Sequence, residues 1–141
     1  MKPQDYNECI KKLNSIASLD LNWNDDGATP FSADLIDKVK LFLEYLIEVP
    51  NIAITFNSTI QLKYDLGNRH LLIEFFENDI IEVSSCAFDD KLTFAFNQFY
   101  KVINLIKIFF YGKTNNVVLF TGAFNPPTIA HYHMINSVLN N

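Results

Sequence analysis

The middle of the chain alternates between apolar and polar residues, with the two-residue period of a β-strand that has one buried face. Three segments follow this pattern, namely TIQLKYD (residues 59–65), RHLLIEFF (69–76) and IIEVSS (80–85). Polar turns separate them, with Gly67 in the first turn and Asn78 in the second. We therefore expect a three-stranded antiparallel meander, which AITF (residues 53–56) could extend by one strand.

Two segments with helical periodicity precede the meander. In residues 3–18 the apolar side chains recur every three or four positions, at Tyr6, Ile10, Leu13 and Ala17. Ser32 can cap a second helix, because its hydroxyl can accept a hydrogen bond from the first turn, where Asp34 complements the helix dipole. This helix is expected to end before Pro50, and its apolar face carries Leu35, Val39, Phe42, Leu43 and Leu46.

A long apolar segment, FAFNQFYKVINLIKIFFY (residues 94–111), follows the meander. Its polar residues recur every three or four positions and predict a polar stripe along one helical face, formed by Asn97, Lys101, Asn104 and Lys107. A lysine at the centre of a membrane span costs about 2.5–3.5 kcal/mol. We therefore predict a packed amphipathic helix and no membrane insertion.

The predicted elements divide the chain into two parts. Residues 1–112 are expected to form an α+β accessory or regulatory module, an antiparallel β-meander packed with helices. Residues 112–116 read as a linker, and residues 116–141 change to a continuously apolar strand, a glycine turn and a helix. This second part is expected to be the opening βα unit of a parallel-sheet domain.

Composition restricts the classes of function. The chain has 141 residues, 49% of them hydrophobic and 19% charged, which is typical of a globular protein. Its formal net charge of −5 and the lack of a Lys/Arg cluster argue against a nucleic-acid partner. Cys9 and Cys86 lie far apart without a CxxC pair, and no apolar signal segment follows a basic start. We expect a cytoplasmic protein and leave self-association open.

The stretch VVLFTGAFNPPTIAH carries the clearest chemistry. Gly122 follows the expected strand, at the edge where open α/β sheets place their ligands, and lets a phosphate approach the backbone. Thr128 is placed to cap the final helix, and His131 falls in its first turn. Backbone N–H groups and the helix dipole favour an anion there, and a histidine can donate to a phosphate oxygen.

These residues resemble the first signature of the nucleotidyltransferase superfamily with the HxGH-type motif. They match best the nicotinamide and nicotinate mononucleotide adenylyltransferases, whose pattern is G-[small]-F-[N/D]-P-x-[H/T]-x-x-H. Here it runs from Gly122 to His131 as GAFNPPTIAH. Thr128 stands where many members have a first histidine, and Ala130 replaces the usual glycine.

The resemblance implies ATP-dependent transfer of AMP to a mononucleotide in NAD biosynthesis, with Mg²⁺ as cofactor and release of pyrophosphate. It implies a nucleotide site lined by Gly122, Ala123, Phe124, Asn125, Thr128 and His131. His131 is the catalytic candidate, because it would steady the ATP phosphates as charge moves to the leaving group. We assign no metal ligand among the protein's residues.

The family's second signature, a Ser/Thr-rich segment with a phosphate-contacting basic residue, lies well downstream of the first, whereas this sequence ends at Asn141. We therefore expect residues 116–141 to be a truncated unit that is inactive on its own. The alternative is a non-enzymatic interaction or regulatory module of bacterial or mobile-element origin. In that case residues 117–120 would pair with the middle sheet.

Other polar residues have a structural interpretation beside a functional one. The segment WNDDGATPFS, from Trp23 to Ser32, resembles a segment of small uncharacterised bacterial and phage-associated proteins. Asp25 and Asp26 within it could bind a hard cation, but a turn pinned by a buried tryptophan is the preferred interpretation. Glu74 and Glu82 could form a paired carboxylate site or a solvated sheet face. We expect Cys9 in the core and His70 facing solvent.

Overall fold

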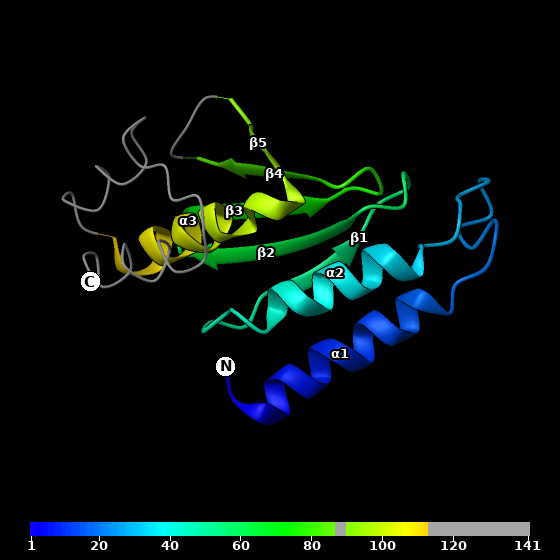
Figure 1. Cartoon of the computed structure of the whole chain (residues 1–141), viewed down its shortest axis with the longest axis horizontal. Coiled ribbons are helices and arrows are strands. Elements are labelled where there is room, and N and C mark those ends of the chain that lie inside the picture. The colour runs from blue at the N-terminus through cyan, green and yellow to red at the C-terminus, as the bar shows by residue number, and fades with distance from the viewer. Residues whose placement is uncertain (87–89, 113–141) are drawn as a thin grey trace. The chain divides into compact units, whose positions relative to one another are not determined.

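The computed structural model describes residues 1–86 and 90–112 (Figure 1). A first compact unit spans Met1–Phe96, and a second unit begins at Asn97. The first contains helices α1 (Pro3–Ala17) and α2 (Ala33–Leu43) and five strands, β1 (Asn51–Ile54), β2 (Ile60–Leu66), β3 (Arg69–Phe75), β4 (Ile80–Ser85) and β5 (Leu92–Ala95). A short 3₁₀ helix, Phe96–Gln98, leads into helix α3 (Phe99–Tyr111) of the second unit.

The five strands form one antiparallel sheet in the order β1-β2-β3-β4-β5. The three central strands and the α+β class confirm the prediction, and β1 adds the fourth strand two residues earlier than expected. Strand β5 was not predicted, because the apolar residues of LTFA run without a turn signal into the helical segment that follows. Residues 116–141, the expected βα unit, lie outside the described residues, so the Rossmann-like part of the fold remains a prediction.

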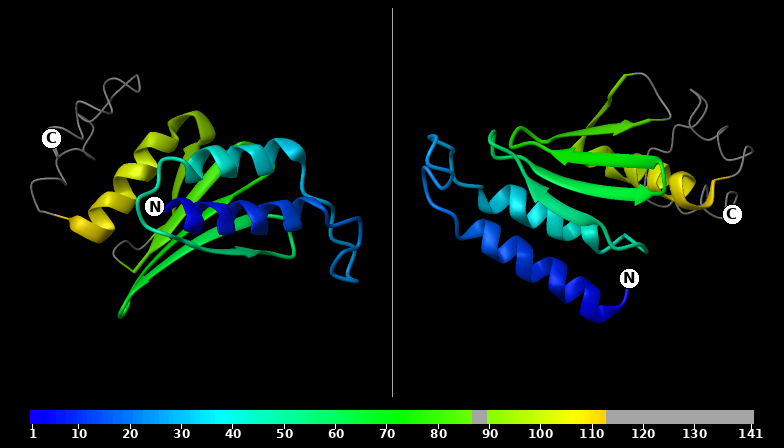
Figure 2. Two further views of the ribbon diagram at one scale, coloured as in Figure 1. Left: turned by 90° about the horizontal axis from the view of Figure 1, so that it is seen from below. Right: turned by 180° about the vertical axis from the view of Figure 1, so that it is seen from behind.

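The sheet has two different faces because successive side chains point to opposite sides. On the inner face, the side chains of β2, β3 and β4 are no more than 1% exposed at Ile60, Leu62, Ile73, Phe75, Ile81 and Val83. Figure 2 shows α1 and α2 side by side on one side of this sheet. The outer face carries the alternating, more polar residues of the same strands, including Gln61, Lys63, Asp65, Leu72, Glu74, Glu82 and Ser84.

Helix α2 makes an aromatic contact with the sheet. Its Phe42 is fully buried and meets Phe75 of β3 edge-on, with ring centroids 5.0 Å apart. Ser32 caps the helix as predicted, since its Oγ accepts a hydrogen bond from Leu35 N at 3.0 Å. The helix ends before Pro50 as expected, but it ends at Leu43, so the inclusion of Leu46 was wrong, because the chain tightens there into shorter i→i+3 bonds.

Helix α3 of the second unit departs from its predicted polar stripe. Asn104 is fully buried, and neither of its amide atoms has a hydrogen-bond partner in the part of the chain that the structure describes. Lys101 and Lys107 are half-buried, and burial lowers the pKa of Lys107 below its ordinary value. The helical period was therefore correct, but the polar side is less solvated than expected. Within residues 1–86 and 90–112, no helix has the length and apolarity needed to cross a membrane.

The two faces of the sheet predict different costs for the same substitution. Leu62→Ala removes a fully buried side chain from the inner face and should lower the free energy of unfolding by about 2–5 kcal/mol. Leu72→Ala, on the outer face of the neighbouring strand, should lower the free energy of unfolding clearly less, because Leu72 is only half-buried. Urea unfolding followed by circular dichroism measures both, and equal losses would contradict this assignment of faces.

Candidate functional site

The predicted nucleotide site lies outside the described residues. This applies to Gly122, Ala123, Phe124, Asn125, Thr128 and His131, and to the expected linker from residue 113 onward. Their roles therefore remain predictions. The described residues offer three other places for chemistry, which are the loop containing Trp23, the acidic residues of the sheet, and two surface cavities.

The Trp23 loop is held by its own side chains. The carboxamide oxygen of Asn22 accepts from Gly27 N at 2.5 Å, and that of Asn24 accepts from Asp26 N at 2.9 Å and from Ala28 N at 3.1 Å. Gly27 has a φ of 83°, which glycine adopts at little cost. These contacts support the interpretation as a turn.

Trp23 is half-buried rather than fully buried, which corrects the expectation. Its Nε1 donates to the carbonyl of Thr29 at 2.9 Å, and its ring lies 5.7 Å from that of Phe31. Among the described residues, no three His, Cys, Asp or Glu side chains are grouped so that they could hold a metal ion. The cation alternative at Asp25 and Asp26 therefore gains no support.

Two polar contacts tie this loop and the start of α2 to turns of the sheet. Ser58, which is 1% exposed in the β1–β2 turn, donates to the carbonyl of Thr29 at 2.6 Å. Glu77, in the β3–β4 turn, accepts from Ser32 N at 3.0 Å and from Ser32 Oγ at 2.6 Å. Ser32 therefore caps α2 and anchors it to the sheet at once.

The acidic residues on the sheet each have a separate partner. Glu74 and Glu82 are direct cross-strand neighbours, as a paired site would require. However, Glu74 accepts from Thr59 Oγ1 at 2.5 Å, whereas Glu82 lies 3.4 Å from the ammonium of Lys91. These contacts favour a structural role for the pair over joint acid–base chemistry.

Asp79, in the β3–β4 turn, is likewise tied to a neighbour. It pairs with Lys38 of α2, whose ammonium also lies 2.6 Å from Asp34. The hydrogen bonds that the Lys38 ammonium donates to Asp34 and Asp79 raise the pKa of Lys38 above its ordinary value. The contact links the sheet to α2 beside the Ser32–Glu77 anchor.

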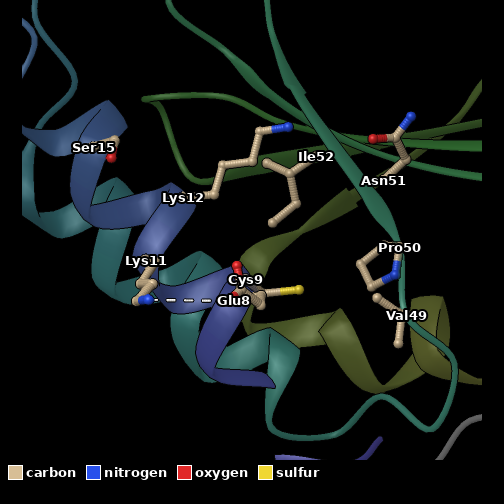
Figure 3. Close-up of a pocket in the computed structure, with 9 residues that line it drawn as sticks. All are labelled: Glu8, Cys9, Lys11, Lys12, Ser15, Val49, Pro50, Asn51 and Ile52. Atoms are coloured by element: carbon tan, nitrogen blue, oxygen red, sulfur yellow. Dashed lines mark ion pairs between the residues drawn. The ribbon is translucent and has the colours of Figure 1, made fainter. Parts of the chain in front are cut away.

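The first cavity, of about 340 Å³, lies between α1 and β1 (Figure 3). Its walls come from Glu8, Cys9, Lys11, Lys12 and Ser15 of α1 and from residues 49–52. Lys12 reaches across it toward Ile52 and Asn51, while Cys9 directs its sulfur toward Val49 and Pro50. Burial raises the pKa of the Cys9 thiol, and the charge of Asp5 raises it further. This thiol is therefore a core group, as expected, and a poor nucleophile.

The second cavity, of about 290 Å³, opens on the outer face of the sheet. It is lined by Lys63, Asp65, His70, Leu71, Leu72, Ser84, Ser85 and Cys86. Asp65 and His70 are cross-strand partners, and Asp65 Oδ1 lies 2.5 Å from His70 Nδ1. His70 is 62% exposed, which confirms that it faces solvent. The lining of this cavity therefore includes a cysteine, a histidine and an aspartate.

The sequence reasoning missed this grouping although its signal was present. The β2–β3 turn at Gly67 sets Asp65 opposite His70, and the register of β3 with β4 ends at the pair Leu71 and Ser85. Cys86 is the first residue after β4, one position past the Ser85 end of that register. Both turns were predicted, so the order of the strands would have placed Cys86 near the end of β3 that carries His70.

Comparisons of the chain with models of protein families, with curated proteins and with solved structures found no match. The resemblance to adenylyltransferases consequently rests on the ten positions from Gly122 to His131. Function has to be argued from individual residues.

Removal of the Ser32 anchor should destabilise the fold. Ser32→Ala loses the cap of α2 and the bond to Glu77, and should lower the free energy of unfolding by about 1–2 kcal/mol. Ser32→Asp should also destabilise it, although aspartate is normally a good cap, because its carboxylate would face that of Glu77. Urea unfolding is the measurement. Ser18→Ala, at the exposed end of α1, is the matched control and should change stability by less than about 0.5 kcal/mol.

The two cysteines should differ in accessibility. Cys86 is exposed, whereas Cys9 is 6% exposed and its thiol stays protonated. Near neutral pH a maleimide should therefore label Cys86 in the folded protein and Cys9 only after denaturant is added. Peptide mapping by mass spectrometry reads each site separately, and rapid labelling of Cys9 without denaturant would contradict its placement in the core.

Proposed function

We propose that the chain is a nucleotidyltransferase-like protein whose parent activity is ATP-dependent adenylyl transfer to nicotinamide or nicotinate mononucleotide. In this proposal residues 116–141 supply the phosphate-binding part of a nucleotide site, and residues 1–112 form an accessory or regulatory module. The observation that carries the proposal is the sequence GAFNPPTIAH, from Gly122 to His131.

Each residue type in this stretch suits a nucleotide phosphate. Gly122 would let the phosphate approach the backbone, and Thr128 would cap a helix whose first N–H groups face the anion. His131 would donate a hydrogen bond to a phosphate oxygen. ATP and Mg²⁺ are part of the proposal because the resemblance to adenylyltransferases implies them. In the described ranges no three acidic, histidine or cysteine side chains are grouped to hold a metal ion.

A second candidate is a non-enzymatic interaction or regulatory module. It is favoured by the contacts in Met1–Phe96, where the polar groups of Ser32, Glu74 and Glu77 serve to hold the fold. In this case residues 116–141 would act as a structural extension, and ATP would leave them unaffected.

Binding of ATP separates the two candidates. In a nuclear magnetic resonance titration of the isotope-labelled protein, ATP with Mg²⁺ should shift the amide resonances of residues 122–131. We expect a dissociation constant of about 1 mM or weaker, because one βα unit supplies only part of a nucleotide site. Nicotinamide mononucleotide, titrated separately, tests for the acceptor.

Two histidine variants make the titration specific. His131→Ala should abolish the shifts, whereas His133→Ala should retain them, since two positions apart on a helix the side chains point to different faces. If residues 122–131 do not respond to ATP, or if both variants respond like the parent protein, the adenylyltransferase proposal fails. The interaction-module proposal then gains support.

A further inference from the structure

We propose that Cys86 is a reactive nucleophile, that His70 is its general base, and that Asp65 positions His70. The substrate class is a small ester or thioester that carries a negative charge. This site lies in the cavity of about 290 Å³ on the outer face and does not depend on the proposed nucleotide site.

The register of the sheet aligns the three groups. Asp65 and His70 are directly opposite each other on β2 and β3, and Cys86 directly follows β4, one position past the Leu71–Ser85 pair. Leu71 is buried on the inner face, so the alternation places His70 on the outer face with Asp65, and Cys86 lines the same cavity as both. Cross-strand neighbours have Cβ atoms about 4.5–5.5 Å apart.

The hydrogen bond between Asp65 and His70 fixes how the imidazole can act. A carboxylate can only accept, so the 2.5 Å contact of Asp65 Oδ1 with His70 Nδ1 requires the proton on Nδ1. In the uncharged ring, the other nitrogen, Nε2, is then the acceptor that can take a thiol proton. Asp65 therefore selects the tautomer that a general base needs.

The three groups suit a proton relay. Neighbouring strands lie about 4.8 Å apart, so His70 lies between Asp65 on β2 and Cys86 at the end of β4. In the part of the chain that the structure describes, no three His, Cys, Asp or Glu side chains are grouped to hold a metal ion. A relay from carboxylate to imidazole to thiol needs only neighbouring contacts.

The rest of the cavity indicates the substrate class. Lys63, Leu72 and Ser84 form the adjacent outer-face row, since Lys63 pairs with Leu72 and Leu72 pairs with Ser84. The Lys63 ammonium provides a positive charge for an anionic group, and Leu72 provides an apolar wall. A volume of about 290 Å³ fits a small ligand.

The proposed step is acyl transfer to the thiol. The Cys86 sulfur bonds to the acyl carbon of the substrate, and the bond from that carbon to the alcohol or thiol leaving group breaks. The thiol proton passes to His70 Nε2 and then to the leaving group. The product is an acyl thioester on Cys86, with no oxidant or reductant involved.

The first test is the rate at which iodoacetamide alkylates each cysteine of the full chain near neutral pH, measured by peptide mapping. Cys86 should react faster than the same cysteine in the urea-unfolded protein. His70→Ala should slow it by about tenfold or more, and added imidazole should restore part of the loss. His133→Ala is the control and should leave the rate unchanged.

The positioning role of Asp65 has its own readout. Asp65→Asn should slow alkylation, whereas Asp65→Glu should retain most of the rate, because only a carboxylate holds the Nδ1–H tautomer. The Asp65–His70 pair is exposed, and exposed ion pairs contribute little to stability, so these variants should fold. Circular dichroism checks this for each variant.

The second test addresses the substrate. The ratio of the Cys86 alkylation rate with iodoacetate to that with iodoacetamide should be higher in the folded protein than in the unfolded protein. Lys63→Gln should remove this increase. The nitrophenyl half-ester of glutaric acid should release nitrophenolate and acylate Cys86 faster than nitrophenyl acetate does. A Cys86 rate equal to that of the unfolded chain, or unaffected by His70→Ala, overturns the proposal. Equal rates for the anionic and neutral reagents overturn the substrate class.

Discussion

The register of the antiparallel sheet is the constraint on which the remaining structure depends. Because side chains alternate with a period of two, a slip of one residue would carry Leu62 and Ile73 from the core to solvent. The same slip would turn the charged side chains of Lys63 and Glu74 toward the apolar core, where burying an unpaired charge is costly. The apolar inner face therefore determines which side chains meet on the outer face.

Polar contacts reinforce this register at one end of the sheet. Ser32 is joined to Glu77, Thr29 to Ser58 and Lys38 to Asp79, so the Trp23 loop and the start of α2 are held against the β1–β2 and β3–β4 turns. The opposite end holds the β2–β3 turn, with its exposed Asp65–His70 pair. Stability and accessible chemistry are thus separated along the strands, as is common for sites carried on a rigid scaffold.

The sequence predicted those elements in which one periodicity dominates. Strands β2, β3 and β4 alternate cleanly, and α1 repeats its apolar residues at helical spacing. Strand β5 was missed because LTFA adjoins a helix that is also apolar. The end of α2 was misplaced because Leu46, beyond the helix, is buried as a helical residue would be. Burial of Asn104 could not be predicted, since an amide at that spacing normally faces water.

The two candidate sites differ in how sequence and structure reveal them. The loop from Gly122 to His131 is contiguous, so its chemistry can be read from spacing alone. Asp65, His70 and Cys86 come from two strands and from the residue that follows a third, so their proximity becomes visible only once the strand order is known. The side chains of Asp65 and His70 lie on the outer face, where an exposed ion pair adds little to stability. Replacing them leaves the inner core intact, so a change in the reactivity of Cys86 can be attributed to chemistry rather than to unfolding.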